Sequence, residues 1–158
     1  MNDLSNIIKH IRDRSYMSGI ERDKSRIKST GEVFTPTSLV QEMLDTLDQS
    51  LFSDPTKTFI DPSGCGDGQF LGEVLIRKLE NGIDFETALS TIFGIEKEYD
   101  NLVLCRNRLL CGREDLRYIV EKNIIQGDAL KIKNWKFDGT DPYKSEQDMH
   151  NETLFEIS

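Results

Sequence analysis

The chain has 158 residues, a hydrophobic fraction of 37% and a formal net charge of -8 at pH 7. This length supports one domain with a buried core, and no apolar run approaches the length needed to span a bilayer. The negative net charge argues against non-specific binding of nucleic acid by the whole surface.

Apolar spacing and turn residues predict helices that alternate with short strands along the chain. The expected helices are 4–12, 37–47, 69–80, 85–92 and 101–111, with one or two further helical turns within 115–121. The expected strands are 58–60, 93–96 and 123–130. Because helices separate the strands, the sequence predicts an α/β fold with a short parallel sheet and right-handed crossovers.

Several turn and cap residues mark the ends of these helices. Asn81-Gly82 is typical of a left-handed helix end, and Asp84 is typical of a helix N-cap. Asp100 is expected to cap the helix that begins at 101, and Gly112 is expected to end it.

Charge divides the chain into three parts: a basic helical segment at 1–29, a central domain at 30–135 and an acidic polar tail at 136–158. The basic segment is compatible with a polyanionic partner, and equally with a solvated charged helix. The three cysteines are odd in number and lack metal-type spacing, and residues 1–15 show no signal-peptide pattern. We therefore expect reduced thiols, no metal site and a cytoplasmic protein.

Each of the three expected strands delivers a carboxylate at or near its end: Asp61, Glu96 and Asp128. In a parallel sheet the carboxyl ends of the strands meet at one edge, where ligands bind. Each acid alone also has a local explanation as a helix cap or turn former. Together, after a glycine-rich loop, they predict a ligand site.

The loop IDPSGCGDGQFL (60–71) differs from phosphate-binding loops. It has no Lys or Arg, it misses the dinucleotide glycine pattern, and Asp61 and Asp67 would repel a phosphate. Carboxylates suit an ammonium group, ribose hydroxyls and an exocyclic amine instead. S-adenosylmethionine has these groups and no phosphate, so we expect it as the ligand.

Four motifs resemble those of S-adenosylmethionine-dependent, adenine-N6 DNA methyltransferases, in particular phage-type and restriction–modification M-subunit homologues. They are TGEVFTP (30–36), FIDPSGCGDGQFL (59–71), FGIEKEYDN (93–101) and IIQGDAL (124–130). The resemblance implies the cofactor half of a Rossmann-like class I methyltransferase fold, with DNA as substrate. It implies these cofactor-binding residues: Phe34, Thr35, Pro36, Asp61, Gly64, Gly66, Gly68, Phe70, Glu96 and Asp128. The loop is one residue longer than the family pattern, and either Gly64 or Cys65 is the inserted residue.

The family's catalytic motif, Asn/Asp-Pro-Pro-Tyr/Phe, does not occur in the sequence. The nearest candidate is Asp141-Pro142-Tyr143, which lacks the second proline and also reads as an ordinary turn. Three hypotheses follow: a methyltransferase, a non-catalytic cofactor binder or half of a split enzyme completed by a second chain, and a remnant without cofactor.

Four further residues have two interpretations each. Trp135 and Phe137 could stack on a base or cover the edge of the sheet, and Phe34 could touch the ligand or join the core. Cys65 has no histidine partner nearby in the sequence, so we expect it to be a packed small residue rather than a nucleophile.

Overall fold

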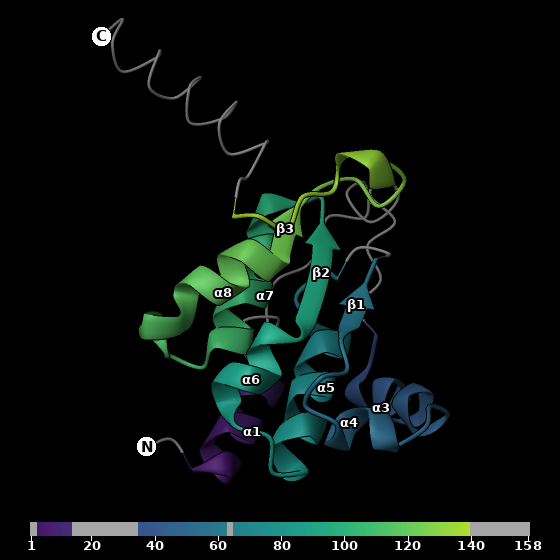
Figure 1. Cartoon of the computed structure of the whole chain (residues 1–158), viewed down its shortest axis with the longest axis vertical. Helices are drawn as coiled ribbons and strands as arrows, with labels where there is room; N and C mark the ends of the chain where they lie inside the picture. The colour runs from purple at the N-terminus through teal and green to yellow at the C-terminus, as the bar shows by residue number, and fades with distance from the viewer. Residues whose placement is uncertain (1–2, 14–34, 63–64, 140–158) are drawn as a thin grey trace, which may run out of the picture.

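The computed structural model describes residues 3–13, 35–62 and 65–139. Within them three parallel strands form one sheet in the order β1-β2-β3. The strands are β1 (Phe59–Asp61), β2 (Ile92–Glu96) and β3 (Ile124–Gln126). They lie side by side with their arrowheads pointing the same way (Figure 1). This confirms the α/β fold with a short parallel sheet.

Helices precede and separate the strands, as the sequence predicts. They are α1 (Leu4–Arg12), α3 (Thr37–Asp45), α4 (Ser50–Ser53), α5 (Gln69–Glu80), α6 (Phe85–Ser90), α7 (Tyr99–Leu110) and α8 (Arg117–Asn123), with short 3-10 turns η2 (Glu114–Leu116) and η3 (Ile132–Asn134). Within the described ranges, no helix is both long and apolar enough to cross a bilayer.

The core forms where α5 and α7 pack against the sheet, and α1 and α3 pack against α5. In α5, Leu71 and Leu75 recur at helical spacing and are fully buried, as is Ile92 of β2. Burying each such side chain contributes about 1.5–3 kcal/mol. The cluster therefore fixes α5, and with it the glycine-rich loop that precedes it, against the sheet.

Several helix ends agree with the sequence prediction. The side chain of Asp84 accepts a hydrogen bond from the Thr87 amide at 3.0 Å, so it is the N-cap of α6. Gly82 follows α5 in the left-handed region at φ 86°. Cys111 and Gly112 both take positive φ after α7 and end that helix.

The N-cap prediction for Asp100 is wrong. The helix α7 begins at Tyr99 with Glu98 as its N-cap, so Asp100 lies inside the first turn. The amide of Glu98 donates to Glu96 Oε1 at 2.9 Å, and this contact starts the turn earlier than the local sequence indicates.

The third strand is shorter than the predicted 123–130. It ends at Gln126, because the chain turns at Asp128, whose Oδ1 accepts from the Leu130 amide at 2.9 Å. Leu130 looks like a strand residue in the sequence but is 92% exposed. The second strand, in contrast, begins one residue early, at Ile92.

The helix predicted at 37–47 ends at Asp45 in the structure. The sequence places Leu39, Val40, Met43, Leu44 and Leu47 on one apolar face of this helix. In the structure only Val40 and Leu44 are buried, and the other three are exposed. The predicted boundary between the basic segment and the central domain, after residue 29, lies outside the described residues and stays a prediction.

Candidate cofactor site

Asp61 and Glu96 lie on the same face of the sheet, close to its carboxyl edge. Asp61 pairs with Gly94, and Glu96 is two residues further along β2. Side chains two residues apart share a face, so both carboxylates point to the helix-covered side. One strand spacing combined with a two-residue advance places their Cα atoms about 8 Å apart.

Asp128 continues this diagonal across the sheet. Glu96 pairs with Gln126, and Asp128 is two residues beyond that partner. It sits in a turn rather than at the end of the strand. The backbone carbonyl of Asp128 accepts from Trp135 Nε1 at 2.9 Å, which anchors the turn. The three acids thus follow one another at the carboxyl ends of neighbouring strands.

Trp135 and Phe137 return the chain over the sheet. Phe137 packs edge-to-face on Phe93 with ring centroids 5.3 Å apart. Because Phe93 belongs to the middle strand, Phe137 covers a face of the sheet and not its edge, which corrects the edge-covering interpretation. Trp135 contributes the hydrogen bond from its indole N–H to the Asp128 carbonyl, which neither sequence interpretation predicts.

The glycine-rich loop is tied to β2 through its own amides. The Gly66 amide donates to Glu96 Oε2 at 2.6 Å, and the Cys65 amide donates to the Ile95 carbonyl at 2.8 Å. The Gly68 amide donates to the Cys65 carbonyl at 2.9 Å. These three N–H groups are therefore used by acceptors of the protein itself, two on β2 and one in the loop, whereas a phosphate-binding loop presents its N–H groups to the ligand. Glu96 therefore keeps the loop closed against β2.

Two glycines of the loop are required by backbone shape and space. Gly66 and Gly68 have φ values of 55° and 90°, a region that L side chains rarely adopt. A Cβ on Gly68 would also lie 3.0 Å from Cys105 Sγ. Helix α7 thus approaches the loop as closely as a glycine permits.

Asp67 does not contribute the free negative charge assumed from the sequence. Its side chain is only 2% exposed and lies 3.4 Å from Arg108 Nη1, so the two charges compensate each other. The prediction that Asp67 repels a phosphate is therefore wrong. The loop still differs from a phosphate-binding loop, because the amides of Cys65, Gly66 and Gly68 are bonded within the protein.

Thr35 and Pro36 are joined to the loop by Gln69, which the sequence interpretation overlooked. Gln69 Nε2 donates to the Thr35 carbonyl at 2.7 Å and to Thr37 Oγ1 at 3.2 Å. Pro36 is the N-cap residue of α3, and its carbonyl accepts from the Val40 amide. The end of the first motif, at Thr35, is therefore held beside the start of α5.

The remaining predicted site residues are placed as follows. Phe70 is partly buried and packs against the hydrophobic core. Phe34, Gly64, Asp141, Pro142 and Tyr143 lie outside the described residues. Among the residues that the structure describes, no cluster of His, Cys, Asp and Glu has a metal-binding arrangement.

The match to a known family agrees with this geometry. A model of the N-6 DNA methylase family matches residues 21–151, which is most of the chain. The chain belongs to the N-6 DNA methylase family. Comparison with curated proteins and with solved structures gave no match. The Rossmann-like fold of the described residues and the family together make this a DNA methyltransferase-like protein, and members of the family generally use S-adenosylmethionine.

In this N-6 DNA methylase family member, the loop cysteine is a packed residue. Cys65 Sγ lies 3.9 Å from Cys105 Sγ, and both side chains are buried. The hydrogen bond with Cys105, and then burial, raise the pKa of the Cys65 thiol well above its ordinary value. Burial raises the pKa of the Cys111 thiol to about 12. These thiols are unsuited to nucleophilic attack, which requires the thiolate.

We therefore expect no fast reaction of the folded protein with Ellman's reagent at pH 8. With a pKa of about 12, only about one Cys111 thiol in ten thousand is ionised at that pH. All three cysteines should react in guanidinium chloride. One equivalent of rapid reaction in the native state would contradict the burial and protonation described for these thiols.

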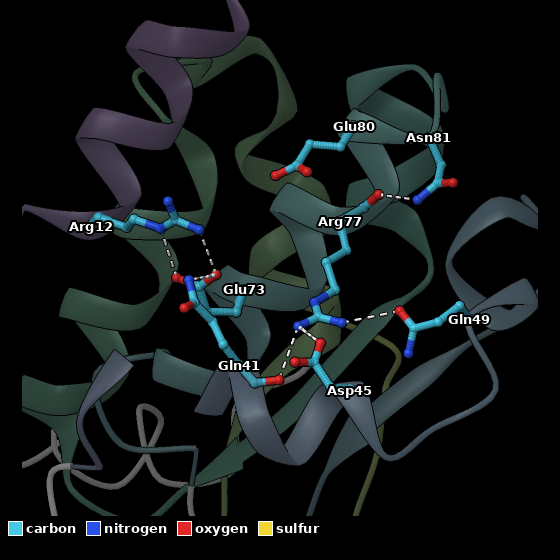
Figure 2. A pocket seen from close by; sticks show the side chains of 8 residues that line it. All are labelled: Arg12, Gln41, Asp45, Gln49, Glu73, Arg77, Glu80 and Asn81. Atoms are coloured by element: carbon cyan, nitrogen blue, oxygen red, sulfur yellow. Dashed lines mark hydrogen bonds and ion pairs between the residues drawn. The ribbon is translucent and has the colours of Figure 1, made fainter. Parts of the chain in front are cut away.

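The family member also has a polar cavity of about 330 Å³ away from the cofactor motifs. Its walls come from α1, α3 and α5 with adjoining turns (Figure 2), and the lining residues are Arg12, Gln41, Asp45, Gln49, Glu73, Arg77, Glu80 and Asn81. Both arginines are paired, Arg12 with Glu73 at 2.9 Å and Arg77 with Asp45 at 2.7 Å. No predicted cofactor residue lines this cavity, so we do not assign the cofactor to it.

Proposed function

We propose that the chain binds S-adenosylmethionine at the carboxyl edge of its sheet. Asp61 accepts from the ammonium group, Glu96 from the ribose hydroxyls and Asp128 from the adenine amine. Gly66 and Gly68 allow close approach of the loop, and Thr35 and Pro36 support the methionine end. Phe34, Gly64 and Phe70 belong to the same proposed set through the family resemblance.

One observation carries this proposal: acidic side chains follow one another at the carboxyl ends of three neighbouring strands, beside a loop whose amides are used internally. The arrangement offers hydrogen-bond acceptors and no free cation from the described loop. It therefore fits a nucleoside with a cationic end better than a nucleotide.

The chemistry we propose is methyl transfer to the N6 amine of adenine in DNA. When bound, the cofactor supplies a methyl group on a sulfonium centre, and the protein contributes positioning rather than a strong base. A base in a duplex must leave the stack to reach such a site. Asp141, Pro142 and Tyr143 remain the candidates in this chain for the acceptor and stacking roles. We further propose a cytoplasmic role in DNA modification of the phage or restriction–modification type.

A second candidate function is favoured by the missing Asn/Asp-Pro-Pro-Tyr/Phe motif. In the described residues β1 pairs with β2 alone, and Ile60 of β1 is 48% exposed. An unpaired strand edge can accept another strand. The chain could therefore act as a non-catalytic cofactor binder, or as the cofactor half of an enzyme completed by a second chain.

Two measurements separate these functions. Isothermal titration should show binding of S-adenosylmethionine and S-adenosylhomocysteine, weakened by Asp61→Ala. The absence of binding would reject both cofactor hypotheses. Transfer of a tritiated methyl group to unmethylated DNA by the purified chain alone would establish catalysis. Binding without any transfer would favour the non-catalytic or split form.

A further inference from the structure

The buried Arg108 of α7 connects parts of the protein that are distant in sequence. Its side chain is 6% exposed. Nε donates to the Ile11 carbonyl at 2.7 Å, Nη1 to the Asp67 carbonyl at 3.0 Å, and Nη2 to Gln69 Oε1 at 2.7 Å. One guanidinium thus joins the last turn of α1, the glycine-rich loop and the start of α5.

Gln69 extends this connection to the first motif. It accepts from Arg108 through Oε1 and donates through Nε2 to the Thr35 carbonyl. With both ends of the amide used, its orientation is fixed. The result is a continuous path of hydrogen bonds from α1 through Arg108 and Gln69 to Thr35.

The last turn of α1 is also docked directly on the first turns of α5. A Cβ on Gly72 would lie 2.7 Å from Ile11 Cγ2, so α1 crosses α5 where no side chain intervenes. Beside this contact Arg12 makes two hydrogen bonds to the carboxylate of Glu73, at 2.9 and 3.0 Å. Figure 2 shows Arg12 reaching from α1 toward Glu73. These contacts hold the Ile11 carbonyl in place for Arg108.

We propose that Arg108 and Gln69 are positioning residues for the cofactor. Through these two residues, α1 holds the glycine-rich loop in its binding conformation. The proposal rests on the proposed function for its effect on affinity. The loop contains Gly66 and Gly68 and loses much backbone entropy when it is ordered. A buried arginine that orders the loop before the ligand arrives lowers the cost of binding.

The chain offers a matched control for Arg108. Arg106 lies on the same helix, is also buried, and donates to the carbonyls of Ile124 and Glu121, where α8 leads into β3. Arg108→Met and Arg106→Met should both lower the unfolding temperature. At a temperature well below both transitions, Arg108→Met should raise the dissociation constant for S-adenosylhomocysteine at least tenfold. Arg106→Met should leave it within about twofold.

A conservative variant separates positioning from general stability. Gln69→Glu retains an acceptor for Arg108 but loses the donor to the Thr35 carbonyl. It should keep most of the thermal stability while weakening binding. Equal affinity of Arg108→Met, Arg106→Met and the unmodified protein would overturn the proposal.

Amide hydrogen exchange gives a readout that needs no ligand. Loop amides from Cys65 to Gly68 should exchange at least tenfold faster in Arg108→Met than in Arg106→Met. If the unmodified protein fails to bind the cofactor, the proposed function fails, but exchange still decides whether Arg108 orders the loop. Identical exchange rates of the loop amides in the two variants would refute the proposal that Arg108 orders the loop.

Discussion

Replacing Glu96 with alanine should raise the dissociation constant for S-adenosylmethionine by at least about a hundredfold. In the proposed site Glu96 accepts from the ribose hydroxyls, and it already closes the loop through the amides of Gly66 and Glu98 at 2.6 and 2.9 Å. Hydrogen bonds to a charged group contribute about 1.5–3 kcal/mol each, so losing two of them corresponds to about a hundredfold in affinity. Isothermal titration measures the effect.

Two control variants make this result specific. Glu96→Gln keeps the shape and one acceptor oxygen and should bind more tightly than Glu96→Ala. Glu121→Gln removes an exposed carboxylate on α8, away from the loop, and should bind as the unmodified protein does. Unchanged affinity in a folded Glu96→Ala protein would exclude this carboxylate from the cofactor site.

Replacing Gly68 with alanine should have the largest effect on folding, with a loss of about 2–4 kcal/mol in the free energy of unfolding. Two costs combine. The residue has φ 90°, where a side chain is strained, and the new methyl group would lie 3.0 Å from Cys105 Sγ. Urea denaturation would measure the loss, and binding of the cofactor should weaken because the loop must shift.

Substitution of Gly82 measures the backbone cost separately from the cost of the contact with Cys105. Its φ is 86°, close to that of Gly68, but a Cβ there would meet nothing within 4 Å. Gly82→Ala should therefore show the backbone cost alone, about 1–2 kcal/mol. Adding Cys105→Ala to Gly68→Ala removes the sulfur and should recover part of the excess, relative to Cys105→Ala alone. Equal losses for the two glycine variants would show that the contact with Cys105 does not matter.

The elements of the fold were largely predictable because their signals are local. The apolar spacing of α1 and the turn residues after α5 fall within a few positions of the features they determine. The end of β3 was missed because the apolar residues Ala129 and Leu130 follow shortly after the strand. There the hydrogen bond from the Leu130 amide to Asp128 turns the chain, and the sequence gives no periodicity that marks this choice.

The site was predictable only in part, for a related reason. Strand-end acids are visible because parallel strands bring their carboxyl ends to one edge. The pairing of Asp67 and the fixed orientation of Gln69 depend on Arg108, which lies 41 and 39 residues further along the chain. The only sequence signal is an arginine within a helix, three residues after Cys105 and next to Leu109 in the sequence. An arginine in such a position predicts a buried hydrogen-bond acceptor, even when no acceptor lies nearby in the sequence.

We propose above that one ligand occupies the carboxyl edge of the sheet, in reach of Asp61, Glu96 and Asp128. The most direct test is an amide chemical-shift map recorded while S-adenosylhomocysteine is added to the labelled protein. Binding at this edge should shift mainly the amides of Gly66–Gly68, Glu96–Glu98 and Gly127–Leu130. Shifts confined to the polar cavity around Arg12, Glu73 and Arg77, or none at saturating ligand, would contradict it.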